Sequence, residues 1–529
     1  MKSIRLRLAS WCTVLVLVFA ANATAQAPRT RGNAAPDLRL VEAVRSQDRQ
    51  RIAAAFKLGA DVKSASPDGS TALHWAVYWE DVETAERLIR AGANVKVAND
   101  LGMTPLVLAC SNTTGVLVEK LLAAGADANT ALASGETALM LAARAGNVAA
   151  VRALLAGGAN VNAREQTHSQ TALMWAVANV RPEVTRLLLD RGAEVSARAA
   201  TSQLVFNMGG NRSAGSASAE TPLEEVPLGG TTPLLFAARS GDLESAKLLL
   251  AKGANANDTL ADGNTALIVA VHSGHGSVAQ VLLEHGADVK AAPLGYTALH
   301  AAVLRGTLRD RGVQNTDPLS GLPLVKLLLD KGADVNARLT KGTPVRRWSH
   351  DFAFLERWSG ATPFWLASKF LEVEMMRALA AAGADVTIGS RDGAPPLLVA
   401  AGYGYSRASG TEAFTKDRRD FSYYNTEPFA VATSIPAEEE RLAVEAVKLL
   451  LSLGAKVNVT ALNGDTAVHS AAALGMDSVI RVLAEAGADL QVKNRAGRLP
   501  ADVARRDNGI GSSSIREKTV ELLKTLAAK

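Results

Sequence analysis

Histidine clusters are the first feature through which this chain could perform chemistry. His272, His275 and His285 lie within one short stretch and could hold a metal ion. Zinc sites in proteins usually add cysteine pairs or an H-E-x-x-H helix to such histidines. The sequence has neither of these motifs, so we predict no metal site.

Two further motifs imitate nucleotide-binding or catalytic sites but lack a required part. The run Gly274-His-Gly276-Ser-Val-Ala279 has the glycine spacing of a dinucleotide loop, yet no acid follows about 20 residues later to hold a ribose. The nearest approach to a G-x-S-x-G serine elbow is Asn211-Arg-Ser-Ala-Gly215, in a Ser/Gly-rich stretch. A hydrolase hidden at 402–441 would need a nucleophile and a base, and that stretch has no histidine or cysteine. The sequence therefore predicts no enzyme and no cofactor.

The N-terminus has the three-part layout of a secretory signal peptide. Lys2, Arg5 and Arg7 precede an apolar run at 11–20, and Ala23-Thr-Ala25 supplies a small-residue cleavage site. The apolar run is too short for a membrane-spanning helix, which needs about 20 residues. We predict a signal peptide at 1–25 and a flexible linker at 26–36. The mature protein is then exported to the periplasm or the extracellular space, with no stable membrane span.

Composition and charge exclude further classes of function. Of the 529 residues, 48% are hydrophobic and 21% are charged, which is enough apolar material for a large core. Signal cleavage removes three cations and no acids, so the net charge falls from +5 to +2. This near-neutral chain gives no general case for nucleic-acid binding. Cys110 then remains as the only cysteine, and we expect it to be a buried, inert thiol.

Two sequence markers recur in step and reveal the elements of the fold. A Gly-Ala step followed by an acid or an amide begins at Gly59, Gly92, Gly125 and Gly158, with a period of 33 residues. A threonine followed by Ala-Leu or a similar pair keeps the same period. These marker threonines are Thr71, Thr104, Thr137, Thr171, Thr232, Thr265, Thr297, Thr362 and Thr466, with Pro395 once in the same place.

Each marker has a physical role in a pair of short helices. The threonine oxygen can cap the first helix, and a proline after it suits the first helical position. Alanine pairs such as Ala142-Ala143 allow neighbouring helices to approach closely. The second helix has one apolar face, as at Val184, Leu187 and Leu188, and the glycine of the marker accepts the left-handed conformation that ends it.

The pattern resembles the ankyrin repeat, most closely in Asp68-Gly-Ser-Thr-Ala-Leu-His74 and Leu328-Leu-Leu-Asp-Lys-Gly-Ala-Asp-Val-Asn336. The resemblance extends over 37–529, where we count twelve units. It implies an all-α fold, a single solenoid of helix-turn-helix units with hairpin loops and almost no sheet, and we expect a monomer. It also implies that His74, His300 and His469 bond to neighbouring backbone rather than to a metal.

Departures from the period predict insertions in loops near 199–230, 306–322, 341–359 and 402–441. The first is rich in Ser, Ala and Gly, so we expect a mobile loop. The stretch from 344 to 430 instead contains fourteen of the twenty-four aromatic residues, interleaved with arginines. Tyr, Trp and Arg dominate binding hot spots, which favours a role in partner recognition. The same rings would also serve to dock the insertions on their own solenoid, and the sequence leaves both interpretations open.

The repeat therefore indicates a binding scaffold that recognises a protein partner of unknown identity. The resemblance places the seventh and eighth residues after each marker threonine on the concave surface. These positions and the aromatic insertions give the candidate partner-binding residues Tyr78, Trp79, Arg144, Arg239, His272, Arg305, Lys369, Phe370, Tyr403, Trp348, Trp358, Arg418 and Arg419. The alternative function is a small-ligand or glycan binder that uses the aromatic insertions as stacking platforms.

Overall fold

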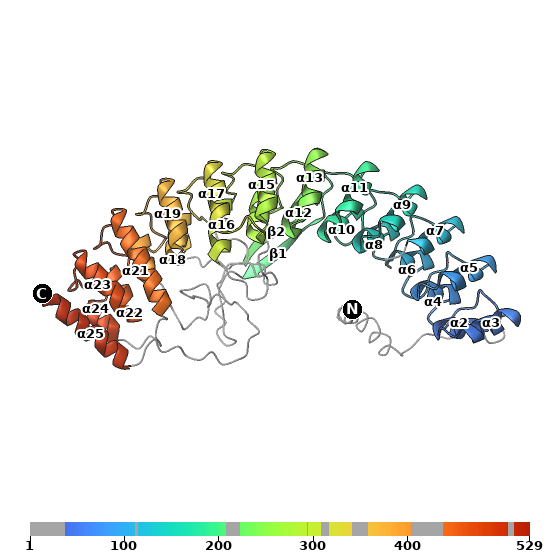
Figure 1. Cartoon of the computed structure of the whole chain (residues 1–529), viewed down its shortest axis with the longest axis horizontal. Coiled ribbons are helices and arrows are strands. Elements are labelled where there is room, and N and C mark those ends of the chain that lie inside the picture. The colour runs from blue at the N-terminus through green and yellow to red at the C-terminus, as the bar shows by residue number, and fades with distance from the viewer. Residues whose placement is uncertain are drawn as a thin grey trace.

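The structure is a computed structural model in which pairs of helices follow one another along an open arc (Figure 1). It describes residues 37–111, 115–207, 223–293, 295–307, 317–340, 358–403, 437–505 and 513–528. In these ranges the regular structure is helical apart from one two-stranded ribbon. The expected all-α solenoid is therefore confirmed, whereas the expected signal peptide and linker lie outside the described residues.

One helix of each pair lines the inner, concave side of the arc, and each inner helix packs on the next one along the chain. The inner helices are α2 (Arg39–Arg45), α4 (Ala72–Tyr78), α6 (Pro105–Ser111), α8 (Ala138–Ala145), α10 (Ala172–Ala178), α12 (Pro233–Ser240), α14 (Ala266–Ser273), α16 (Ala298–Thr307), α18 (Pro363–Lys369), α20 (Pro396–Ala400), α22 (Ala467–Leu474) and α24 (Pro500–Arg505).

The second helix of each pair lies on the outer, convex side (Figure 1). The outer helices are α3 (Arg49–Lys57), α5 (Val82–Arg90), α7 (Val116–Ala123), α9 (Val148–Ala156), α11 (Pro182–Asp190), α13 (Leu243–Ala251), α15 (Gly276–Glu284), α17 (Leu322–Asp330), α19 (Val373–Ala381), α21 (Ala437–Ser452), α23 (Asp477–Glu485) and α25 (Ser513–Ala527). Contacts between pairs run from neighbour to neighbour, as expected of a repeat solenoid.

The marker threonines cap the inner helices as predicted. Thr362 Oγ1 accepts a hydrogen bond from the backbone N–H of Trp365 at 3.1 Å, and Thr137 does the same for Met140 at 3.3 Å. Each bond satisfies an amide that has no partner within its own helix. The sequence marker thus fixes where each inner helix begins.

Histidine adds a bond between repeat units to this cap at three positions. The Nδ1 atom of His300 accepts from the N–H of Thr297 at 3.3 Å, so its Nε2 carries the proton and donates to the carbonyl of Ala361 at 3.3 Å. His74 and His469 make the same pair of contacts with their own neighbours. Burial lowers the pKa of His300 to about 4, so the ring is neutral at pH 7. These histidines are structural, as the resemblance implied.

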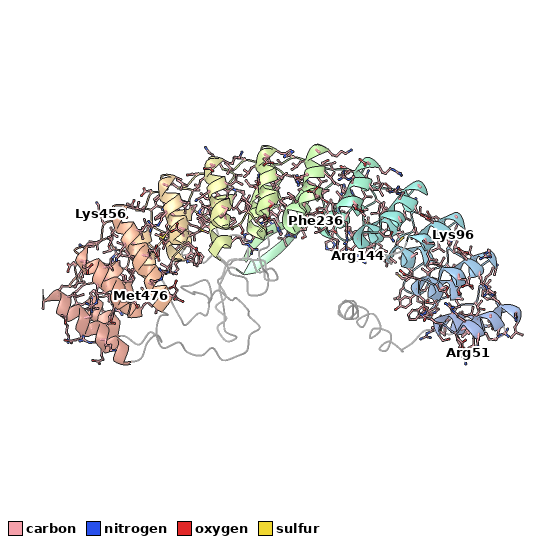
Figure 2. All side chains as sticks on the ribbon, viewed as in Figure 1. Arg51, Lys96, Arg144, Phe236, Lys456 and Met476 are labelled. Carbon is pink, nitrogen blue, oxygen red and sulfur yellow. The ribbon has the colours of Figure 1, made fainter. Side chains whose placement is uncertain are left out.

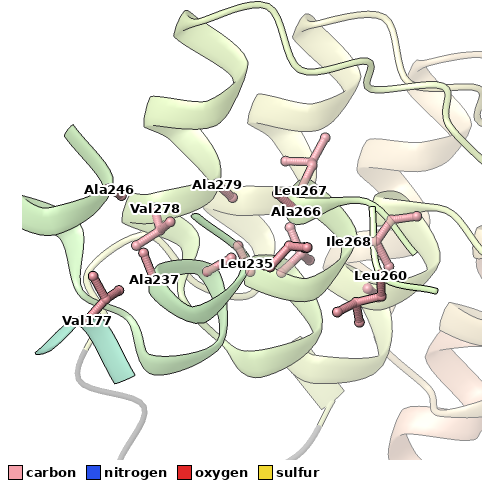
Figure 3. Close-up of a cluster of buried hydrophobic side chains, with 14 of the residues drawn as sticks. Val177, Leu235, Ala237, Ala246, Leu260, Ala266, Leu267, Ile268, Val278 and Ala279 are labelled. Carbon is pink, nitrogen blue, oxygen red and sulfur yellow. The ribbon is translucent and has the colours of Figure 1, made fainter. Parts of the chain in front are cut away.

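Small side chains allow the inner helices to stack closely in a continuous core. In the middle of the arc, Ala237 and Ala266 lie between Val177 and Ile268, and all four are buried (Figure 3). Cys110 belongs to the same core, and burial raises the pKa of its thiol to about 12. The expectation of a buried thiol is confirmed.

The insertion at 199–230 begins and ends as an antiparallel ribbon, which the expectation of a mobile loop missed. Strand β1 (Thr201–Asn207) pairs with β2 (Leu223–Gly229), with Thr201 opposite Gly229. Gly229 has φ 89, and a Cβ there would lie 2.1 Å from the carbonyl oxygen of Ala200, so only glycine fits. The ribbon lies on the inner side of the arc (Figure 1), and α10 still packs directly on α12 across the insertion.

The described end of the insertion at 306–322 is also ordered by the solenoid. The Asp317 carboxylate accepts from both the N–H and the hydroxyl of Ser277, at 3.0 and 2.8 Å. This contact caps the first turn of outer helix α15. The insertion thus connects back to the preceding repeat unit.

Candidate functional site

Two exposed aromatic rings follow one another at the end of inner helix α4. Tyr78 is 44% exposed and Trp79 is 43% exposed, which is unusual for large aromatic side chains outside an interface. Their ring centroids lie 4.8 Å apart with an interplanar angle of 77°, and Trp75 meets Tyr78 edge to face at 5.8 Å. Such contacts hold the rings in a defined arrangement.

Arg45, the last residue of α2, joins this group. Its guanidinium lies over the Trp75 ring, 5.2 Å from the centroid, and its carbonyl accepts a hydrogen bond from Trp79 Nε1 at 3.2 Å. The Trp75 indole nitrogen is buried and has no hydrogen-bond partner among the described residues. We term Arg45, Trp75, Tyr78 and Trp79 the N-terminal aromatic surface.

The same arginine–tryptophan contact recurs three repeat units later. The Arg144 guanidinium, from the end of α8, lies 5.1 Å from the centroid of Trp175 in α10. The Trp175 indole nitrogen is also buried without a partner among the described residues. Figure 2 shows Arg144 and Phe236 on the inner side of the arc, whereas Lys96 and Lys456 lie on the outer side. An arginine stacked on a ring is desolvated on one face only and remains available to a ligand on the other.

The remaining predicted cations divide into free and bonded side chains. Arg239 is exposed and forms no ion pair or side-chain hydrogen bond among the described residues. Arg305 instead donates to the carbonyl of Ser273 at 3.1 Å, and His272 Nδ1 lies 3.0 Å from the buried Tyr296 hydroxyl. A Cβ at Gly274 would lie 2.7 Å from the Arg305 guanidinium, so this contact also needs the glycine. Arg305 and His272 therefore help to join repeat units.

Lys369 and Phe370 do not face the open concave surface, which corrects the expectation for both residues. Lys369 is 3% exposed and donates to the carbonyl of Tyr403 at 3.2 Å. Phe370 is 8% exposed and meets Trp358 edge to face at 5.8 Å. Trp358 also lies 6.3 Å from the buried Trp365. We term Trp358, Trp365 and Phe370 the C-terminal aromatic cluster.

Trp358 and Tyr403 are the described ends of the two aromatic insertions. Both are partly buried, and both pack against the hydrophobic core. For these two residues the structure favours docking on the solenoid over display to a partner. Trp348, Arg418 and Arg419 lie outside the described residues, so their role stays a prediction.

The ninth residue after a marker threonine has a strained backbone in three repeat units. Glu80 and Leu371 have φ of 57° and 56°, and Val180 has 56°. Other repeat units have glycine in this place, for example Gly146 and Gly241. The left-handed region costs a residue with a side chain about 1–2 kcal/mol relative to glycine. The turn between the inner and outer helix therefore has the same left-handed backbone in these units, although their residue at this position is not glycine.

Sequence reasoning missed Arg45, Trp75 and Trp175. Trp75 and Trp175 are each the fourth residue after a marker threonine. In the preceding repeat unit, an arginine lies at or next to the last residue of the inner helix. Aligning the fourth positions as well as the seventh and eighth would have revealed the pairs. The first unit lacks the marker threonine, which is why Arg45 was not counted.

Other kinds of site find no support in the described part of the chain. No three His, Cys, Asp or Glu side chains come together there in a way that could hold a metal ion. None of its helices combines the length and the apolar character needed to cross a membrane.

Comparison with known families agrees with the geometry. A family model described as ankyrin repeats (3 copies) matches residues 40–130, 113–199, 218–293 and 234–339, which together exceed half of the chain. The matched ranges cover inner helices α2 to α16 and both residues of the exposed aromatic pair. The chain therefore belongs to the ankyrin repeat family, whose repeats generally act as scaffolds for protein–protein interaction.

Proposed function

We propose that this chain is an exported, monomeric, non-enzymatic scaffold of twelve ankyrin units that recognises a protein partner through its concave face. The N-terminal aromatic surface is the observation that carries the proposal. It presents two half-exposed rings and an arginine at the open end of the arc, and Trp, Tyr and Arg are the residue types enriched in binding hot spots.

The contacts within this surface support binding rather than packing between repeats. Stacking of α4 on its neighbours already uses Leu73, Ala76 and Val77, each of which is fully buried. Tyr78 and Trp79 lie beyond this layer and keep nearly half of their area exposed. A partner that covers them gains hydrophobic stabilisation at little entropic cost, because edge-to-face contacts and the bond to Arg45 already hold the rings.

The alternative function, a small-ligand or glycan binder that uses the aromatic insertions, has weaker support. A stacking platform needs a free ring face, and Trp358 is instead packed against Trp365 and Phe370. Tyr403 also packs against the core.

Export rests on the signal-like pattern at residues 1–25. N-terminal sequencing of the protein from fractionated cells tests it, and a chain that starts at Gln26 in the envelope or the medium is expected. A chain found in the cytosol that still starts at Met1 would disprove export but would leave the binding proposal intact.

Partner recognition is tested with Trp79→Ala in the full chain. The partner is captured from the cell fraction that holds the protein, identified by mass spectrometry, purified and titrated. We expect about thirtyfold weaker binding, because loss of a hot-spot aromatic costs at least about 2 kcal/mol. The matched control is Leu58→Ala, an even more exposed apolar residue (67%) at the end of outer helix α3. Equal affinity of the wild type and the Trp79 variant for the partner would show that the N-terminal aromatic surface is not the binding site.

A further inference from the structure

The inner helices have a one-sided distribution of charge. From α4 to α22 they contain no Asp or Glu. Their basic side chains are His74, Arg144, Arg239, His272, His300, Arg305, Lys369 and His469. The outer helices mix both signs and pair them, as in Arg90–Glu86 and Lys252–Asp190. The inner helices from α4 to α22 are thus basic and apolar, whereas the outer helices carry both signs of charge.

The helix dipole explains why the inner helices carry arginine near their C-termini, but it does not explain why they lack acids. Arginines near helix C-termini are favoured by the helix dipole by about 0.3–1 kcal/mol. The same dipole favours acids in the first turn, where the outer helices have them, as at Glu83, Glu183 and Glu244. No inner helix from α4 to α22 has an acid there. Those first-turn residues are buried between repeat units, as at Ala138, Leu139 and Met140, and burial excludes an unpaired carboxylate there. The arginines stand instead at the exposed C-terminal ends of the inner helices, where they can attract an acidic ligand.

Two arginines of this face are free to meet such a ligand. Arg144 and Arg239 are exposed, and neither forms an ion pair with any described residue. The carboxylate that follows Arg239 most closely, Asp242, is buried at the N-cap of α13 and accepts from the N–H of Ser245. It therefore belongs to the solenoid and does not neutralise the surface.

Apolar rings lie on the same face as these arginines. Trp175 and Phe236 each occupy the fourth position after a marker threonine and are half-buried, so part of each ring remains open. The guanidinium of Arg144 lies over Trp175, which leaves its planar edge available for a bidentate bond to a carboxylate. We term Arg144, Trp175, Phe236 and Arg239 the cationic inner surface.

We propose that the cationic inner surface binds a partner segment in which carboxylates alternate with apolar side chains. This inference rests on the proposed function and specifies the chemistry of the partner. Carboxylates pair with Arg144 and Arg239, and apolar side chains cover Trp175 and Phe236. An apolar surface with a few separated cations suits a protein segment better than a nucleic acid, which requires a continuous row of phosphate contacts.

The test uses a random peptide library displayed on phage and selected against the immobilised full chain. Peptides enriched in Asp and Glu together with aromatic or aliphatic residues are expected. Their binding should weaken at least about tenfold in the Arg144→Glu/Arg239→Glu variant, because charge reversal replaces attraction by repulsion. Higher salt should also weaken binding, since exposed charges are screened.

The matched control reverses the same charges on the convex face. Arg152→Glu/Arg186→Glu changes two exposed arginines of α9 and α11 that likewise form no ion pair with described residues, and it should leave peptide binding unchanged. Circular dichroism and thermal unfolding establish that both variants are folded.

Three outcomes would overturn the inference. Selected peptides could lack carboxylates, or the convex-face control could weaken binding as much as the concave-face variant. Oligothymidylate could also compete for the face while no acidic peptide is enriched, which would make a nucleic acid the occupant. Selection of neutral peptides whose binding depends on Trp79 would contradict only this inference. The proposed function would also be contradicted if no selected peptide bound the concave face and if Trp79→Ala left the affinity for the protein partner unchanged.

Discussion

Trp79 and Phe370 occupy the same position of their repeat units, eight residues after Thr71 and Thr362, yet their environments are opposite. Trp79 is 43% exposed and bonded to Arg45, whereas Phe370 is 8% exposed and packed on Trp358. The comparison shows that the repeat register places a side chain at the concave edge without fixing its exposure. Residues from an insertion cover one site and leave the other open.

The largest expected effect is on the stability of the C-terminal aromatic cluster. Phe370→Ala should lower the free energy of unfolding by about 3 kcal/mol or more, because it removes a buried ring and leaves a cavity. Trp79→Ala should lower it by only about 1 kcal/mol, since the ring is half-exposed and one hydrogen bond is lost. Urea denaturation followed by circular dichroism measures both. Similar losses for the two variants would show that the two positions do not differ as the structure indicates.

Acid should weaken the C-terminal region, because His300 connects α16 to the residue before Thr362. The pKa of His300 is lowered by burial to about 4, below its value of about 6.5 in the unfolded chain. The unfolded state therefore binds the proton first, and stability is lost as the pH falls from about 6.5 to about 4. The expected loss is up to about 3 kcal/mol.

Unfolding curves at several pH values measure this loss. His300→Gln should flatten the dependence on pH, whereas the same substitution at His168, whose side chain is 68% exposed, should leave it in place. A dependence that persists in His300→Gln would assign it to other groups, of which His74 is the first to test, because burial lowers its pKa as well.

The smallest effect concerns the strained residues that follow the two aromatic positions. Glu80→Gly should stabilise the protein by a few tenths of a kcal/mol, since relief of the positive φ exceeds the entropy cost of glycine. Leu371→Gly relieves the same strain but removes a side chain that is only 3% exposed, so it should destabilise by about 2 kcal/mol. Thermal unfolding compares the two variants. A change in melting temperature of the same sign for both would contradict the expected difference between the Trp79 and Phe370 regions.

The fold was predictable because its signals are local. Each marker threonine caps a helix within the same few residues, and each histidine at the third position bonds to the next unit in a recurring way. The ribbon at 201–229 was missed because the Ser, Ala and Gly of its middle dominate the composition of the whole insertion. Its two ends, which contain Leu204, Val205 and Val226, form short apolar runs typical of strands.

The candidate site was only partly predictable because exposure depends on contacts distant in sequence. Tyr78 and Trp79 were expected at the concave surface from their positions after Thr71, and both are exposed. The burial of Lys369 depends on Tyr403, and that of Phe370 on Trp358, which belong to insertions outside the regular period. Counting positions within one unit cannot reveal such contacts.

The neighbour-to-neighbour stacking of inner helices also has a mechanical consequence. Each interface sets a small rotation between two units, and these rotations add along the arc to give its curvature. We therefore expect small changes at many interfaces to add up to a large change in the separation between α4 and α18, with little change inside any one unit. A partner that binds near both α4 and α18 would change the curvature of the arc. Its affinity would then depend on the stiffness of helix interfaces that it does not contact.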